Sequence, residues 1–234
     1  MKVAQFEKAN VLNVITKQLR TLNGGEVLVQ VQACGVCGTD VHIVEGSSRS
    51  TPPVVLGHEY AGIVTDVAKG TTDITVGQHV GVDPNISCGI CFYCRRGLVH
   101  LCENLRALGV DIDGGMAEYC IVPIKQIYSL PQDMSYELSA FIEPISCAIH
   151  GIDLAKIKAG DTVVILGGGT IGLLMLQLAR SAGAARIIVV EPLEHKRKLA
   201  TELGADVVLN PTELDVQSGI LAAILDLTNV GADV

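Results

Sequence analysis

The sequence predicts a mixed β and α/β chain, in which an antiparallel β-barrel-like domain precedes the first half of a doubly wound parallel sheet. Three observations support this class. Short segments with alternating apolar and polar residues, separated by glycines, occupy the first 125 residues. A helical pattern covers residues 135–154. From residue 159 onward, strand-like and helix-like segments alternate, as they do in βαβ units.

The first domain is expected to span residues 1–154. Residues 26–32 alternate apolar and polar side chains, which is typical of a half-buried strand. Residues 54–67 and 76–82 show a similar alternation and are predicted to be further strands. The helical segment 135–154, with apolar side chains near one face, is predicted to link this domain to the next.

The second domain is expected to span residues 155–234. Its predicted strands are 162–166, 186–191 and 206–209, and its predicted helices are 170–182, 194–203 and 215–228. Residues 232–234 resemble the opening of a fourth strand. Because a doubly wound sheet usually has about six strands, we expect this domain to be incomplete and the chain to be a fragment.

Composition argues against several classes of protein. The 234 residues carry a net charge of −8, include 3% aromatic residues and lack tryptophan, so nucleic-acid binding is not expected. Charges near the N-terminus argue against a secretory signal. Glycines 167–169 interrupt the 18 uncharged residues before Arg180, which favours a strand, a turn and a helix over a membrane span. With eight cysteines and no signal, we expect a cytoplasmic protein whose thiols bind metal.

Four cysteines with the spacing C-x2-C-x2-C-x7-C predict a structural zinc site, in a lobe over about residues 86–106. Four thiolates fill the tetrahedral positions that zinc prefers, so such a site holds a loop and leaves no position for a substrate. An iron–sulfur cluster is the chief alternative, and two disulfides are another. The four residues are Cys88, Cys91, Cys94 and Cys102.

A second group of residues could form an open metal site. A thiol at Cys37, an imidazole at His58 and carboxylates at Glu59 and Glu143 together suit zinc. Catalytic zinc usually has three protein ligands and one exchangeable position. Sequence spacing alone does not bring residues so far apart together, and a buried structural histidine is an equally good interpretation of His58.

A glycine-rich turn with the pattern G-x-G-x-x-G follows the predicted strand 162–166 and opens a long apolar helix, which is the context of a dinucleotide-binding turn. Gly167 allows the tight turn, Gly169 lets a pyrophosphate approach the backbone, and Gly172 lets the helix pack closely on the strand. The whole turn comprises Gly167, Gly168, Gly169, Thr170, Ile171 and Gly172.

The residue at the end of the next predicted strand bears on the choice of cofactor. A carboxylate at Glu191 can accept hydrogen bonds from the adenosine ribose hydroxyls and would repel a 2′-phosphate, which favours NAD over NADP. Lys196 and Arg197 weaken this preference, because either could receive a phosphate. Arg197 is also a candidate contact with the adenosine.

These motifs, in this order, resemble the zinc-containing medium-chain alcohol dehydrogenase superfamily, and in particular its sorbitol, butanediol and threonine dehydrogenase branch. The resemblance covers the chain from about residue 24. It implies a GroES-like β-barrel catalytic domain followed by a Rossmann NAD-binding domain. The matching segments are 35–40, 57–59, 88–102, 113–119 and 143–146.

The resemblance also implies metal-binding roles. Cys37 and His58 would bind a catalytic zinc. Glu143 occupies the position where this branch has a glutamate in place of a cysteine, and Glu59 would be a direct or an alternating ligand. Asp40 would accept a hydrogen bond from the other nitrogen of His58 and thereby fix its tautomer.

Thr39 and His42 resemble the hydroxyl and the imidazole that pass the substrate proton to solvent, and with Glu59 they form the expected catalytic group. We therefore expect an NAD-dependent alcohol or polyol dehydrogenase with one catalytic and one structural zinc, acting reversibly on a secondary alcohol and forming a homo-oligomer, either a dimer or a tetramer.

One alternative is a zinc-stabilised, nucleotide-binding interaction protein without catalysis. Another is a superfamily member that works without catalytic zinc, such as a quinone or enoyl reductase. A fragment with an incomplete second domain could also bind metal without activity.

Overall fold

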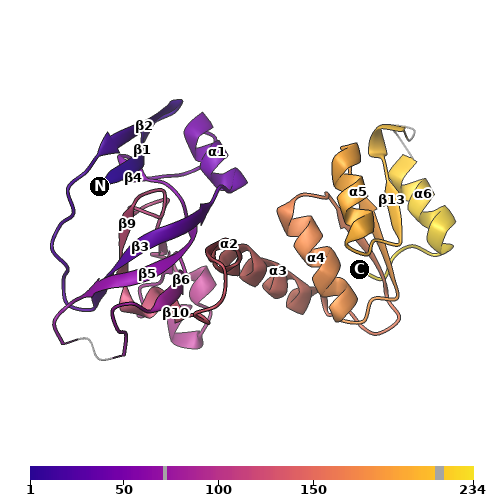
Figure 1. Cartoon of the computed structure of the whole chain (residues 1–234). Coiled ribbons are helices and arrows are strands. Elements are labelled where there is room, and N and C mark those ends of the chain that lie inside the picture. Colours follow the sequence, from indigo (N-terminus) through magenta and orange to yellow (C-terminus); the bar gives the residue numbers. More distant parts are fainter. Residues whose placement is uncertain (71–72, 214–218) are drawn as a thin grey trace. The chain divides into compact units, whose positions relative to one another are not determined.

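A computed structural model describes residues 1–70, 73–213 and 219–234 (Figure 1). The described residues form two compact units, Met1–Glu143 and Pro144–Val234. Helix α3 (Ile142–Ala155) begins at the junction of the two units. The division after residue 154 that the sequence suggests would assign this helix to the first domain, and it stays a prediction.

Antiparallel sheets build the first unit. The larger sheet has the strand order β10–β6–β5–β3–β9, and a smaller one has the order β2–β1–β4. All pairings in both sheets are antiparallel. The strands of the larger sheet are β3 (Glu26–Gly35), β5 (Glu59–Val67), β6 (His79–Val82), β9 (Tyr119–Pro123) and β10 (Ile127–Ser129), and those of the smaller sheet are β1 (Lys2–Lys8), β2 (Val11–Thr16) and β4 (Val54–Val55).

Alternating side chains explain why these segments pair. Val27 and Val29 of β3 are fully buried and pack with Val64 of β5 and Val80 of β6 in one apolar core. Strand character is thus confirmed in the three segments for which the sequence predicts it. The segment 54–67 is broken at residues 56–58, between β4 and β5.

The expected barrel does not close among the strands that the structure describes. Strands β9 and β10 each pair on one side only, so the larger sheet has two free edges. The smaller sheet joins it through isolated contacts instead of a continuous ladder. One is the bridge between Val3 and Ala117, and another is the hydrogen bond from the Ala4 N–H to the Met116 carbonyl, at 2.8 Å.

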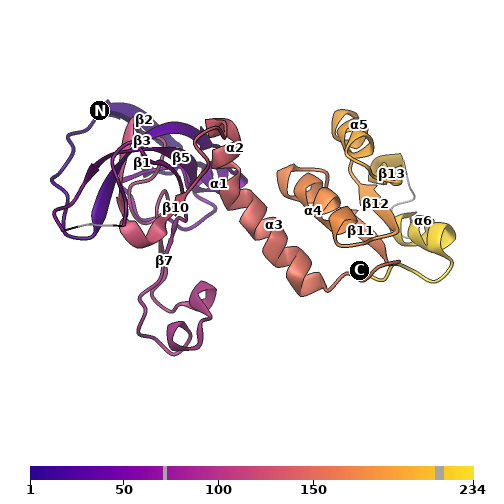
Figure 2. The same cartoon turned by 60° about the horizontal axis from the view of Figure 1, so that its bottom comes forward.

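Short helices and a lobe complete the first unit. Helix α1 (Gly38–Glu45) follows β3, and helix α2 (Tyr136–Ala140) lies against the larger sheet. Strands β7 (Asn85–Ile86) and β8 (Arg106–Ala107) pair at the base of a lobe that projects from the unit in Figure 2. The short 3-10 helices of this unit are η1 (Cys94–Arg96) and η2 (Val99–Leu101) in the lobe, and η3 (Ile124–Gln126).

The second unit contains a parallel sheet with the order β11–β12–β13. Figure 1 shows helices α4 and α5 on one side of this sheet and α6 on the other, as right-handed crossovers require. The confirmed elements are β11 (Thr162–Leu166), α4 (Thr170–Ser181), β12 (Arg186–Val190), α5 (Glu194–Glu202), β13 (Val207–Leu209) and α6 (Gly219–Thr228), with the 3-10 helix η4 (Pro211–Glu213) after β13. Residues 215–218 of the last predicted helix lie outside the described residues.

The last residues of the chain extend this sheet on its β11 edge. The Val234 N–H donates to the Thr162 carbonyl at 3.3 Å, and the Val164 N–H donates to the Val234 carbonyl at 2.9 Å. Val234 thus donates to one residue of β11 and accepts from the residue two positions further on, which is the hydrogen-bond pattern of parallel strands. Residues 232–234 therefore lie where a fourth strand would begin. The spatial order, from β13 through β12 and β11 to these residues, is the order 3-2-1-4 of a doubly wound sheet.

Within the described residues, no helix combines the length and the hydropathy that crossing a lipid bilayer requires.

Three glycines allow the backbone around residue 57 to pack unusually closely. Gly57 has a φ of +92°, and a Cβ on Gly109 would lie 2.4 Å from the Gly57 carbonyl oxygen. A Cβ on Gly114 would lie 2.1 Å from the same oxygen, with only backbone atoms to move aside. The segment that precedes His58 thus packs directly against the backbone of the 109–116 loop. A side chain at any of these glycine positions would prevent this close contact.

We expect Gly114→Ala to lower the free energy of unfolding by about 2 kcal/mol or more, because the added methyl group collides with backbone. Gly24→Ala is the control, since no described atom lies within 4 Å of a Cβ at that position. Urea unfolding followed by circular dichroism measures both. Equal stability of the two variants would contradict this account of the close packing.

Candidate metal centres and nucleotide site

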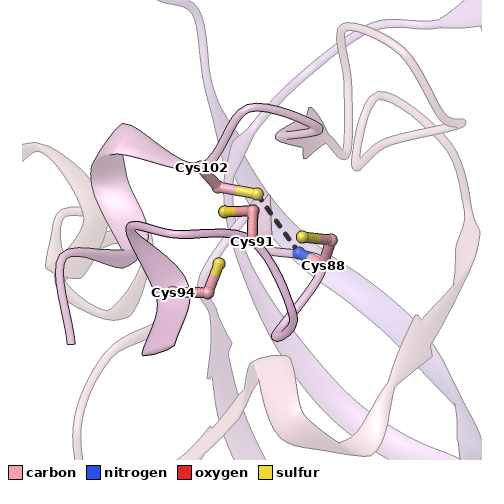
Figure 3. A group of neighbouring side chains, drawn as sticks. All are labelled: Cys88, Cys91, Cys94 and Cys102. Carbon is pink, nitrogen blue, oxygen red and sulfur yellow. Dashed lines mark hydrogen bonds between the residues drawn. The ribbon is translucent and has the colours of Figure 1, made fainter. Parts of the chain in front are cut away.

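The lobe brings its four cysteines to one point. The sulfur atoms of Cys88, Cys91, Cys94 and Cys102 all lie within 4.8 Å of one another (Figure 3). Four sulfurs around one zinc ion, each at about 2.3 Å, would be about 3.8 Å apart in a tetrahedron. The arrangement therefore fits a single ion with four thiolate ligands. The Cys88 N–H also donates to the sulfur of Cys102 at 3.3 Å.

Local backbone geometry produces this arrangement. Gly89 and Gly97 have φ values of +73° and +76°, so they make the tight turns that direct successive cysteines inward. The lobe has little apolar core of its own, because Ile90 and Phe92 are 71% and 56% exposed. A bound metal would supply the cohesion that side-chain packing does not.

The thiols of the lobe differ in their affinity for protons. Backbone N–H groups of Cys94 and Glu103 lower the pKa of Cys91 to about 6, so its thiolate, the form that binds zinc, is favoured at neutral pH. Desolvation and the hydrogen bond with Cys91 raise the pKa of Cys94 to about 11. Metal binding must therefore displace at least one proton from this group.

The second group joins residues from two distant segments. Ligand atoms of Cys37, His58 and Glu59 lie within 4.8 Å of one another. Cys37 immediately precedes α1, His58 lies between β4 and β5, and Glu59 begins β5 opposite Gly35. A Cβ on Gly35 would lie 2.4 Å from the Glu59 Oε2, so glycine at this position makes room for the carboxylate.

A buried carboxylate holds these two segments together. Asp40 is 3% exposed, and its Oδ2 accepts a hydrogen bond from the Cys37 N–H at 2.9 Å. Its Oδ1 accepts a hydrogen bond from the Gly57 N–H at 3.3 Å. One side chain thus fixes both the start of α1 and the residue before His58.

The charge of Asp40 also acts on the imidazole. Burial lowers the pKa of His58, but its interactions with Asp40 and Cys37 outweigh burial and raise that pKa to about 9. The Asp40 Oδ1 lies 3.5 Å from the His58 Nδ1, which is ion-pair range, and within the described part of the chain Nδ1 makes no hydrogen bond. At 3.5 Å the contact is an ion pair, longer than the hydrogen bond expected between these side chains.

The donor set suits a zinc ion. Thiol, imidazole and carboxylate are ligand types that zinc accepts, and three protein donors leave a position open for a further ligand. The donor group contains Cys37, His58 and Glu59, without Glu143, among the residues that the structure describes. Glu143 is half-buried in the first turn of α3, and its role as a ligand stays a prediction.

The two residues expected to relay a proton lie near the start of α1. The sulfur of Cys37 lies 3.6 Å from the Thr39 Oγ1, so the hydroxyl is next to the candidate metal site. His42 lies one turn further along α1, where its side chain is 62% exposed and its Nδ1 is 3.5 Å from the Glu45 Oε2. The path between them stays a prediction.

Sequence reasoning missed part of what holds this site. It assigned Asp40 a role toward His58 but not its two backbone hydrogen bonds, and it gave no role to Gly35. One signal was available. Asp40 is the third residue of a helix that starts just after Cys37, the position from which an acidic side chain reaches back to the residue before the helix.

The glycine-rich turn lies between β11 and α4. Gly167 has a φ of +104°, and a Cβ on Gly172 would lie 1.9 Å from the Gly167 carbonyl oxygen. No described atom lies within 4 Å of a Cβ on Gly169, which precedes α4 without a side-chain cap. The first N–H groups of α4 therefore lack a capping side chain, and such groups attract phosphate.

Glu191 lies beside this turn. It is 4% exposed, its Oε2 accepts a hydrogen bond from the Gly168 N–H at 2.8 Å, and its Oε1 accepts one from the Leu193 N–H at 2.8 Å. Burial raises the pKa of Glu191, but these two N–H groups lower it overall. Arg197 donates to the carbonyl oxygens of Glu191 and Pro192, at 2.9 and 2.6 Å. Glu191 and the glycine turn thus lie together as the sequence suggested.

Comparison with known proteins matches both units. The model of the alcohol dehydrogenase GroES-like domain matches residues 23–132, and the model of the zinc-binding dehydrogenase domain matches residues 170–234. A 2-dehydro-3-deoxy-L-galactonate 5-dehydrogenase from Pseudoalteromonas atlantica is 37% identical over 100% of this chain and 68% of its own length.

The chain belongs to the zinc-containing medium-chain alcohol dehydrogenase superfamily. An L-threonine 3-dehydrogenase from Pyrococcus horikoshii is 42% identical to this chain. The match covers 88% of this chain and 59% of the length of that enzyme. A zinc-binding dehydrogenase from Sinorhizobium meliloti, solved bound to NADP, is 46% identical with a TM-score of 0.90, covering 93% of this chain and 64% of its own. The chain thus spans about three fifths of the length of the threonine dehydrogenases that it matches.

We expect Asp40→Asn to weaken zinc binding at the Cys37 site by about 10- to 100-fold, as loss of a supporting carboxylate does in other zinc proteins. The amide keeps the size of the side chain but turns a donor toward one of the two N–H groups. Competition with a chromophoric chelator measures the affinity. Asp66→Asn on the exposed end of β5 is the control, and zinc in the cysteine lobe should be unaffected by either change. Unchanged affinity in the Asp40 variant would contradict the positioning role.

Proposed function

We propose that this medium-chain dehydrogenase oxidises a secondary alcohol reversibly, with NAD as the hydride acceptor. The observation that carries the proposal is the meeting of Cys37, His58 and Glu59 within 4.8 Å, in a chain that also contains a glycine-rich turn beside a buried glutamate. Three donors with an open position suit catalysis, whereas the four-cysteine lobe suits a structural role.

Different residues of the chain have different roles in the proposed reaction. When bound, zinc supplies Lewis acidity that lowers the pKa of an alcohol, and the nicotinamide accepts the hydride. Cys37 and His58 would hold the metal, and either Glu59 or Glu143 would be the third protein ligand, so that one position stays open for the alcohol. The hydroxyl of Thr39, next to the Cys37 sulfur, accepts the proton of the alcohol and donates its own proton onward, so it returns to its neutral form. His42 then passes a proton to solvent, to which it is exposed.

The names of the relatives narrow the substrate class. L-Threonine and 2-dehydro-3-deoxy-L-galactonate, the compounds for which two of them are named, both carry a carboxylate. We therefore propose that the substrate is a small secondary alcohol with an acidic group. Thiolate ligands require reduced cysteines, which favours a cytoplasmic enzyme. A dimer or tetramer stays a prediction from the family resemblance.

The metal test uses Cys37→Ser. We expect two zinc ions per chain in the unmodified protein and one in the variant, because only the Cys37 site should empty. NADH formation with a panel of threonine, sugar acids and polyols should be lost, while NADH binding, followed by fluorescence, should persist. Cys147→Ser, which changes an exposed cysteine on α3, should keep both zinc ions and turnover.

Either of two results would contradict the proposal. One zinc per unmodified chain, with nucleotide binding but no turnover, would favour a zinc-stabilised, nucleotide-binding interaction protein. Turnover retained in Cys37→Ser would remove the zinc mechanism.

The cofactor test uses Glu191→Ala. Loss of the carboxylate removes acceptors for the ribose hydroxyls and the repulsion of a 2′-phosphate, so the preference for NAD over NADP should fall by about tenfold or more. Dissociation constants for both nucleotides measure this ratio. The test matters because one solved relative holds NADP. An unchanged ratio would show that Glu191 does not select the cofactor.

A further inference from the structure

An exposed arginine in the loop after α1 uses only one of its nitrogen atoms in the contact that it makes. The side chain of Arg49 is 76% exposed, and its Nη2 lies 3.0 and 3.1 Å from the two carboxylate oxygens of Asp111. The side-chain contacts described for Arg49 all use this one nitrogen. A guanidinium has five N–H donors, so the Nη1 and Nε edge can still receive a second partner.

Asp111 forms a rigid base for this arginine. Its side chain is 6% exposed and also accepts hydrogen bonds from the Thr51 hydroxyl at 3.0 Å and the Ala107 N–H at 3.1 Å. The Asp111 carboxylate therefore keeps partners without Arg49, and an ion pair with so exposed an arginine contributes little to stability. Arg106 donates to the backbone carbonyl of Asp111 at 3.1 Å, which further fixes the position of this residue.

Backbone contacts connect the loop that carries Arg49, and the segment that carries its partner Asp111, to the candidate active site. In the loop, the N–H groups of Ser47 and Ser48 donate to the His42 carbonyl at 2.9 and 3.1 Å. In the segment of Asp111, Gly109 packs against Gly57 so closely that a Cβ there would lie 2.9 Å from the backbone nitrogen of His58. Asp111 lies two residues beyond Gly109, a span of at most about 7 Å.

We propose that Arg49 binds the acidic group of the substrate. The proposal rests on the proposed function and names the residue that recognises the substrate's charge. The chain carries a net charge of −8, which disfavours the approach of an anion, so an acidic substrate needs a local cation. The planar guanidinium matches a carboxylate with two parallel hydrogen bonds, and Asp111 holds it in place for that contact.

The test compares alcohols that differ in the acidic group. L-Threonine with L-threoninol and galactonate with galactitol are pairs in which the carboxylate is replaced by a neutral hydroxymethyl group. Isothermal titration calorimetry of the zinc-loaded protein gives affinities without requiring turnover, and NADH formation gives KM and kcat. In Arg49→Gln, the affinity for the acidic member of the preferred pair should fall about tenfold or more, with the neutral member within twofold.

Two variants complete the design. Arg49→Lys keeps the charge but not the planar fork and should restore part of the affinity for the acid. Arg20→Gln is the matched control, because Arg20 is also exposed and paired with one carboxylate, that of Glu26, in another segment. Melting temperatures of all variants should stay within about 3 °C of the unmodified protein.

The outcomes separate this inference from the proposed function. The inference is supported when the unmodified protein prefers the acid and Arg49→Gln removes that preference. This holds even when the protein oxidises no alcohol. Absence of oxidation would contradict only the proposed function. Equal affinity for acid and neutral alcohol in both pairs overturns the inference, as does an equal loss for both members in Arg49→Gln. Oxidation of neutral alcohols with no effect of Arg49→Gln on either pair supports the function and overturns the inference.

Discussion

The buried carboxylate of Asp40 is the interaction on which the candidate catalytic site depends. It accepts hydrogen bonds from backbone N–H groups at Cys37 and Gly57, which are 20 positions apart in the sequence. A buried carboxylate without such donors is costly, so the start of α1 and the segment before His58 cannot separate without a large loss of free energy. The glycines around residue 57 make this approach possible, because they let backbone lie against backbone. The positions of the metal-binding side chains therefore depend on the folding of the first unit as a whole.

The two metal centres reach their geometry by different routes. The lobe places four sulfurs together with tight turns inside 15 consecutive residues, almost independently of the sheet behind it. The Cys37 site draws one donor from the residue before α1 and two from the consecutive residues His58 and Glu59, where β5 begins. A site of the first kind depends mainly on turns within one short segment. A site of the second kind requires the sheet to fold first, and this difference matches the structural and catalytic roles proposed for them.

Local patterns predicted much of this molecule. Alternation around Val27 and Val29 gave strand β3, and the change to helical periodicity after the glycine turn gave α4, because both signals depend on neighbours in the chain. The cysteine spacing gave the lobe for the same reason. Closure of the barrel was not settled by such patterns, since it depends on which distant strands pair. Asp40 illustrates the same limit. Its place near His58 followed from a family resemblance, and its place in α1 signals the hydrogen bond to the Cys37 N–H. Its hydrogen bond to the Gly57 N–H depends on a meeting of distant segments that no local sequence signal encodes.

The lobe has a consequence for how proteins of this architecture diversify. It leaves the first unit through the two-residue strands β7 and β8, and its exposed Ile90 and Phe92 contribute little to the main core. Insertions, deletions or complete replacement between these two strands would leave the sheet and its interior almost untouched. The lobe is therefore a peripheral module, whose length and surface can change with little effect on the packing of the main core.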